Sequence, residues 1–64
     1  MFINGKEKIL TQPILLNNLL SQLGYRPQLI AVELNGKIIK QAAFTSTTVT
    51  DADKMEIVSF VGGG

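Results

Sequence analysis

The chain has 64 residues and a formal net charge of +1, and it contains neither cysteine nor histidine. This length allows one small domain that buries only about 60% of its unfolded surface, so its stability depends on dense packing, on a partner, or on both. The composition excludes Ser-His and Cys-His nucleophile pairs and thiolate metal ligands. The near-neutral charge argues against a nucleic-acid binder, which usually carries a basic patch.

Neither a membrane span nor a secretion signal is apparent in the sequence. The longest unbroken apolar run, residues 29–32, is far shorter than the roughly 18 residues that a membrane span needs. No charged segment followed by an apolar stretch marks a signal peptide at the N-terminus. We therefore expect a cytoplasmic protein that binds neither nucleic acid nor a membrane.

The first ten residues predict a β-hairpin. Asn4-Gly5 is the dipeptide that tolerates the positive φ angles of a tight type I′ turn. A short apolar segment precedes this pair, and residues 6–10 can return as the second strand.

Residues 13–23 predict the main helix. Pro13 suits the first helical position, and Gly24 suits the left-handed residue that ends a helix. Between them, leucines recur with the period of one helical face and should be buried: Leu16, Leu19, Leu20 and Leu23.

A second hairpin is predicted around Asn35-Gly36. The strand before this turn covers residues 29–34, and residues 37–39 can pair back against it. Side chains alternate along such a strand, so Ala31 and Glu33 should point away from the helix. The opposite face should be buried and consists of Ile30, Val32 and Leu34.

The second half of the chain ends in a clear strand. Residues 40–50 are weakly patterned, with Phe44 and Val49 as their sizeable apolar side chains, and residues 51–54 form a polar turn. A last strand follows over residues 55–61. We expect Met55 and Ile57 on its helix-facing side, and the other side to carry Glu56, Val58 and Phe60.

This order of elements predicts an α+β fold of the β-grasp, or ubiquitin-like, type. One main helix would pack across a mixed sheet of four to five strands, because one helix on one sheet buries both apolar faces. The first and last strands would lie parallel at the centre of the sheet. We expect a β-grasp domain over residues 1–61 and a flexible glycine tail over residues 62–64.

The three terminal glycines are the feature that carries chemistry. A tail without side chains can enter a narrow slot, and a partner could activate its carboxylate as an acyl-adenylate. The alternative is an inert terminus. An exposed patch beside the tail would provide a docking surface, because a tail alone offers little contact area. Its predicted members are Ala31, Glu33, Val58, Phe60, Val61 and Gly62.

Other polar groups have simpler interpretations. Asp51 and Asp53 could hold a metal, but a turn before a strand explains them better, and we predict no metal site. Lys37, Lys40 and Lys54 alternate with carboxylates, which favours an ordinary solvated surface. The hydroxyl-rich residues 45–50 have no base nearby, so catalysis there is not expected.

Several segments together resemble the ThiS family, the sulfur-carrier proteins of thiamin biosynthesis. They are Ile3-Asn4-Gly5, Leu19-Leu20, residues 30–36 and, above all, residues 51–64, Asp-Ala-Asp-Lys-Met-Glu-Ile-Val-Ser-Phe-Val-Gly-Gly-Gly. The resemblance covers essentially the whole chain. It departs from the usual family pattern at Ala52 and at Lys40, Gln41 and Phe44.

The resemblance implies a carrier and not an enzyme. An ATP-using enzyme similar to ThiF would adenylate the carboxylate of Gly64, next to Gly63, and the carrier itself would bind no cofactor. Sulfur from cysteine, delivered through a desulfurase, would give a thiocarboxylate. Thiazole synthase, similar to ThiG, would then use that sulfur. Two alternatives stay open: a carrier like the small subunit of molybdopterin synthase, and a non-catalytic ubiquitin-like interaction domain.

Overall fold

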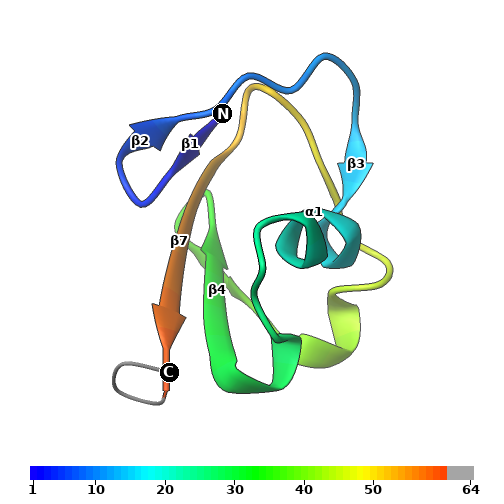
Figure 1. Ribbon diagram of the computed structural model, residues 1–64, viewed down its shortest axis with the longest axis vertical. Coiled ribbons are helices and arrows are strands. Elements are labelled where there is room, and N and C mark those ends of the chain that lie inside the picture. The colour runs from blue at the N-terminus through cyan, green and yellow to red at the C-terminus, as the bar shows by residue number, and fades with distance from the viewer. Residues whose placement is uncertain (61–64) are drawn as a thin grey trace.

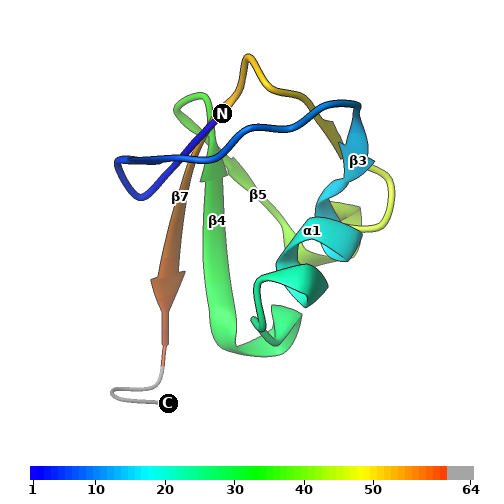
Figure 2. The ribbon, with the colours of Figure 1, turned by 45° about the horizontal axis from the view of Figure 1, so that its top comes forward.

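Five strands form one mixed sheet, and an α-helix lies on one side of it (Figures 1 and 2). The computed structural model describes residues 1–60. The strands follow the spatial order β2-β1-β7-β4-β5. Their bounds are β1 (Phe2–Ile3), β2 (Lys6–Glu7), β4 (Ile30–Leu34), β5 (Lys37–Ile39) and β7 (Lys54–Ser59), and the helix is α1 (Leu16–Gln22).

Strand β7 occupies the centre of the sheet. It runs parallel to β1, with Ile3 beside Met55, and antiparallel to β4, with Val32 beside Ile57. The first and last strands of the described chain are therefore neighbours, as the sequence predicts. This topology confirms the β-grasp expectation. The last strand begins at Lys54, one residue before its predicted start, and its described part ends at Ser59.

Both predicted Asn-Gly turns are present. Asn4 and Gly5 have φ angles of 52° and 81°, and Asn35 and Gly36 have φ angles of 52° and 85°. Positive φ at both central positions is the requirement of a type I′ turn, which matches the twist of the two strands that it joins. The turns therefore fix the registers of the β1·β2 and β4·β5 hairpins.

The helix ends as predicted but begins later. Gly24 has a φ angle of 86°, its N–H donates to the Ser21 carbonyl, and the N–H of Tyr25 donates to the Leu20 carbonyl. This pair of hydrogen bonds is the Schellman motif, which satisfies carbonyls that the helix leaves unpaired. Helix α1 begins at Leu16, so the prediction that Pro13 occupies the first helical turn is wrong.

A tertiary contact explains the late start of the helix. Ile14 and Leu15 form β3 (Ile14–Leu15), which pairs antiparallel with β6 (Thr48–Val49). The carbonyl of Thr47 accepts a hydrogen bond from the Leu16 N–H at 2.7 Å. The carbonyl of Phe44 accepts one from the Asn17 N–H at 3.0 Å. Backbone carbonyls of a distant loop thus cap the helix, where a side chain would commonly do so.

The segment of residues 40–50 contributes to the core despite its weak pattern. Two short 3₁₀ turns frame the second hairpin, η1 (Pro27–Leu29) before it and η2 (Gln41–Ala43) after it. Phe44 follows η2 and is 1% exposed, and Val49 in β6 is fully buried. Leu29 belongs to η1, so the strand after it begins one residue later than predicted.

The buried core lies between α1 and the facing side of the sheet. Leu23 and Leu34 are half-buried at its margin, whereas the sequence predicted them fully buried. They lie near the ends of α1 and β4, where fewer neighbours cover them. The buried members are Met1, Leu16, Leu19, Leu20, Ile30, Val32, Phe44, Val49, Met55 and Ile57.

Candidate functional site

The outer face of the sheet, opposite α1, carries the predicted docking residues. Val58 and Ala31 lie directly opposite each other in the β4·β7 pairing. Val58 is 60% exposed and Phe60 is 67% exposed, whereas Ile57 between Glu56 and Val58 is buried. The alternation of β7 therefore places these two apolar side chains in solvent, as predicted, while their docking role stays a prediction.

Ile38 extends this surface, and sequence reasoning missed it. Ile38 lies opposite Glu33 in the β4·β5 pairing and is 76% exposed. Strand alternation could have identified it. Ile39 pairs with the buried Val32, and neighbouring strand residues point to opposite faces, so Ile38 must face outward. We define the outer patch as Ala31, Glu33, Ile38, Glu56, Val58 and Phe60.

Side-chain amides of both turns fix β7 in position. Asn4 accepts a hydrogen bond from the Ile57 N–H at 2.7 Å and donates one to the Ile57 carbonyl at 3.2 Å. Strand β1 ends at Ile3, so this amide continues the pairing of β7 by one more residue on that side. On the other side, Asn35 accepts from the Lys54 N–H at 2.9 Å.

The pairing of β7 with the β4 side continues to the end of the described chain. The N–H of Phe60 donates to the Leu29 carbonyl at 2.8 Å. This bond anchors the backbone of Phe60, the residue before the terminal segment, to the sheet. The predicted site residues Val61, Gly62, Gly63 and Gly64 lie outside the described residues, and their roles stay predictions.

Asp51 and Asp53 stabilise the turn before β7. Asp51 accepts hydrogen bonds from the Leu10 N–H and from the N-terminal ammonium of Met1, both at 2.9 Å. Asp53 accepts from the Asn35 amide at 2.8 Å and from the Thr50 N–H at 2.7 Å. These donors lower the pKa of each carboxyl below its usual value. Both aspartates thus serve the turn, in agreement with the structural interpretation of the sequence.

The lowered pKa of Asp53 predicts an acid-dependent loss of stability. Its folded-state pKa lies below the unfolded-state value, so its contribution is present above pH about 3.8 and is lost as the pH falls through the folded-state pKa. Asp53→Asn should therefore lower the free energy of unfolding at pH 7 and have little effect at strongly acidic pH. Urea unfolding at both pH values measures the difference, with Glu7→Gln as an exposed control. An equal loss at both pH values would contradict this assignment.

Hydroxyl groups of the loop after η2 also have structural partners. Thr47 Oγ1 donates to the Ala43 carbonyl at 2.7 Å, and Ser46 Oγ donates to the same carbonyl at 3.3 Å. These bonds tighten the loop that caps α1. Both hydroxyls therefore have a structural role in this loop.

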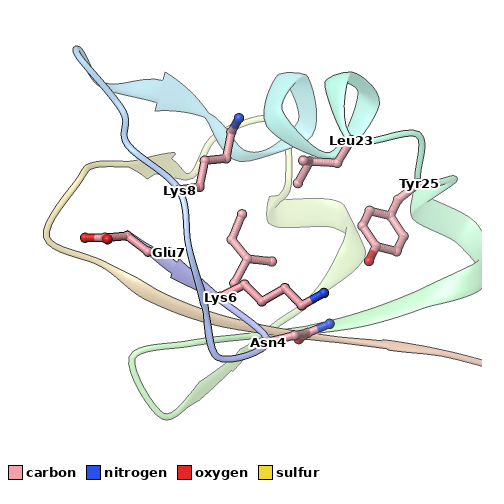
Figure 3. A pocket seen from close by; sticks show the side chains of 7 residues that line it. Asn4, Lys6, Glu7, Lys8, Leu23 and Tyr25 are labelled. Atoms are coloured by element: carbon pink, nitrogen blue, oxygen red, sulfur yellow. The ribbon is translucent and has the colours of Figure 1, made fainter.

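A separate hollow lies between the first hairpin and the end of α1 (Figure 3). Its volume is about 340 Å³, and Lys6 and Tyr25 extend into it from opposite walls. The Asn4 amide at its rim is already bonded to Ile57. Its lining also includes Ile3, Glu7, Lys8 and Leu23. Because Ile3 and Leu23 pack against the core, the hollow belongs to the helix side of the sheet, away from the outer patch.

Residues 1–60 contain neither a candidate metal site nor a candidate membrane-spanning helix. Within residues 1–60, no group of three His, Cys, Asp or Glu side chains is placed to hold a metal ion. In the same range, no helix has the length and apolar character that crossing a membrane requires. The outer patch and the sequence that follows β7 are therefore the candidate site.

Comparisons with known proteins agree with the fold. The profile of the ThiS family matches residues 1–64, the whole chain. The crystal structure of the thiamine biosynthesis protein ThiS from Geobacter metallireducens superposes with a TM-score of 0.82. It is 36% identical to this chain, and the alignment covers 98% of this chain and 96% of that one.

Two kinds of relatives appear among the similar sequences. An uncharacterized protein, ycf40, of Porphyra purpurea is 39% identical over 62 residues, which are 97% of this chain and 87% of the relative. A thiazole synthase of Paramagnetospirillum magneticum is 38% identical over 64 residues. The match covers 100% of this chain but 20% of that protein, so this chain spans about a fifth of that relative's length.

The fold defines the class of protein to which this chain belongs. Its topology and helix packing are those of a small β-grasp protein. Within that class, the chain belongs to the ThiS family.

Proposed function

We propose that this chain is the sulfur carrier that supplies thiazole formation in thiamin biosynthesis. The observation that carries the proposal is the match of the ThiS family over residues 1–64, which includes the terminal glycines. The G. metallireducens structure, a thiamine biosynthesis protein of the same fold, supports the thiamin pathway over the molybdopterin pathway. A carrier of this kind is a protein co-substrate located in the cytoplasm, and its partners perform the catalysis.

The proposed chemistry takes place at the carboxylate of Gly64. An oxygen of this carboxylate attacks the α-phosphate of ATP in a ThiF-like enzyme, and pyrophosphate leaves. A thiol reductant releases hydrosulfide from the persulfide that a cysteine desulfurase forms. The hydrosulfide then attacks the acyl carbon, and AMP leaves. The product is a thiocarboxylate. Adenylation makes this exchange feasible, because AMP is a far better leaving group than an oxide ion.

The experiment is a reconstitution with a purified ThiF-like enzyme, ATP and a sulfur source. Mass spectrometry of the carrier should show the mass gain that corresponds to replacement of one oxygen by sulfur. The same protein should then support thiazole formation when thiazole synthase is added. A carrier whose mass never changes would contradict the proposal.

The outer patch is proposed as the surface that holds the partners. A docking function accounts for the exposure of Val58, on the central strand β7, and of Phe60, just after it and next to the terminal segment. The two thiazole synthase relatives contain a segment similar to 100% and 97% of this chain, which supports physical contact between carrier and synthase. Large apolar side chains at the centre of such a surface commonly carry most of the binding energy.

A charge at Phe60 should weaken docking without unfolding the protein. Phe60→Asp is expected to weaken binding to the activating enzyme at least about tenfold, because a buried carboxylate would replace an apolar contact. Binding is measured by titration calorimetry, and the melting temperature should stay close to that of the unmodified protein. Ile9→Asp is the matched control, since Ile9 is 74% exposed but lies outside the outer patch. Unchanged binding of Phe60→Asp would remove Phe60 from the interface.

A further inference from the structure

An apolar hollow with two carboxylates lies within the outer patch. Its volume is about 270 Å³. Four of its lining residues are apolar, and the two others are glutamates: Ala31, Val32, Ile38, Val58, Glu33 and Glu56. Such a combination suits a ligand group that is apolar along its length and positively charged at its end.

The two glutamates are direct cross-strand neighbours. Glu33 of β4 lies opposite Glu56 of β7, and both point to the outer face. The Cβ atoms of such a pair are about 4.5–5.5 Å apart, and like charges at this distance destabilise the sheet. Within residues 1–60, one ion pair has a nitrogen–oxygen distance below 4.0 Å, and it joins the Met1 ammonium to Asp51. Neither glutamate therefore has a cationic partner within that distance in this range. The free carrier thus holds two carboxylates that repel each other beside an apolar surface.

Lys54 is the cation of β7 on the same face. It lies two residues before Glu56, and it lines a neighbouring hollow of about 350 Å³ together with both glutamates. Its ammonium group makes no ion pair with either glutamate within 4.0 Å. The negative charge of Glu33 and Glu56 is therefore available to a cationic group of a binding partner.

We propose that this hollow receives an arginine side chain of thiazole synthase. The proposal rests on the carrier function proposed above and names the chemistry of one partner contact. The methylene groups of the arginine lie on Ala31, Ile38 and Val58, and its guanidinium group lies between the two carboxylates. Arginine fits better than lysine, because its planar group donates hydrogen bonds to two acceptors at once.

Two observations select this occupant. Two thiazole synthases each contain a segment similar to this chain, so such a segment occurs in one polypeptide with the rest of a thiazole synthase. A second copy of the chain fits poorly, because a symmetric dimer through this face would bring two Glu33 and two Glu56 carboxylates together. Charge complementarity therefore favours a basic partner over self-association.

The test uses the full chain with both glutamates replaced, Glu33→Gln/Glu56→Gln, and purified thiazole synthase as a separate protein. Binding at low ionic strength should weaken about 10- to 100-fold, since the partner arginine loses both charged acceptors. Binding of the unmodified carrier should weaken as salt is added, and the double variant should lose most of this dependence. Glu7→Gln, an exposed change on β2, should bind normally.

Further measurements separate binding from folding and from the carrier function. The melting temperature of the double variant should equal or exceed that of the unmodified carrier, because a repulsive pair is removed. Glu33→Asp/Glu56→Asp keeps both charges and should keep the salt dependence. Thiocarboxylate formation by the unmodified carrier with the activating enzyme is measured in parallel. Failure of that reaction in the unmodified carrier would overturn the proposed function itself.

Unchanged affinity of the double variant, or tighter binding, would overturn the arginine contact and leave the carrier function intact. The same conclusion follows if thiazole synthase does not bind the unmodified carrier. Self-association of the carrier through the outer patch, detected by sedimentation, would replace the proposed occupant with a second copy.

Discussion

Deletion of Gly64 should abolish both adenylation and thiocarboxylate formation. The carboxylate must reach the α-phosphate of ATP inside the activating enzyme, in line for attack. Removal of one extended residue withdraws it by about 3.3–3.6 Å. That distance is far greater than the tolerance of a reactive geometry, in which a misplacement of about 1 Å can cost 100-fold in rate. ATP–pyrophosphate exchange with the activating enzyme measures the effect.

The control for this deletion is stability. The buried core of the described residues is built from side chains between Met1 and Ile57, so the melting curve should be nearly unchanged. Addition of one alanine after Gly64 should block the same reaction by a different route, because its side chain would enter a slot shaped for glycine. Full exchange activity in the deleted protein would overturn the proposed mechanism.

Phe44→Ala should have the largest effect on stability. Phe44 is 1% exposed and is the largest fully buried side chain of the described core. Loss of a buried phenylalanine costs about 3–5 kcal/mol through lost burial and the remaining cavity. A small domain has a free energy of unfolding of only about 5–15 kcal/mol, so the variant should lose a large fraction of its stability. Urea unfolding followed by circular dichroism provides the measurement.

Ile38→Ala is the matched control for the core substitution. Ile38 is also a large apolar residue, but it is 76% exposed, so its loss should change the free energy of unfolding by about 0.5 kcal/mol or less. A Phe44→Ala protein as stable as this control would show that the loop does not close the core. Residual helix without cooperative unfolding would instead show that Phe44 fixes the packing of α1.

The sequence predicted the sheet accurately because its signals are local. Asn4-Gly5 and Asn35-Gly36 require positive φ angles that few other residues adopt, so each turn and its hairpin could be located directly. The leucine period located α1, and Gly24 located its end. Once these elements were placed, one helix across one mixed sheet was the economical way to bury both apolar faces, although other strand orders stayed possible. The structure has the β-grasp order.

The contributions that the sequence could not predict are long-range backbone contacts. The carbonyls of Phe44 and Thr47 cap α1, and nothing in the sequence near Leu16 reveals partners about thirty residues away. Pro13 favours the first turn of a helix, but the pairing of β3 with β6 holds the two residues after it in a strand. The second role of Asn4, its hydrogen bonds to Ile57, was hidden because the turn alone already explained the residue.

The candidate site was predicted in outline. Alternation along β7 and β4 was sufficient to place Val58, Phe60 and Ala31 on the outer face, because each strand has one buried side. The opposition of Glu33 and Glu56 depends on the register between strands distant in the sequence. That register is set by the Asn35 turn and by the contacts at the start of β7, which emerge only from the complete fold.

The central position of β7 also constrains when the protein can fold during synthesis. Strands β1 and β4 both pair with the strand of residues 54–59, which leaves the ribosome after both of them. Until then, the two halves of the sheet have no shared strand, and closing the loop between β1 and β7 costs entropy that earlier contacts cannot offset. Nascent chains that stop before Lys54 therefore cannot complete the sheet. Only a chain synthesised past Ser59 can form the outer patch.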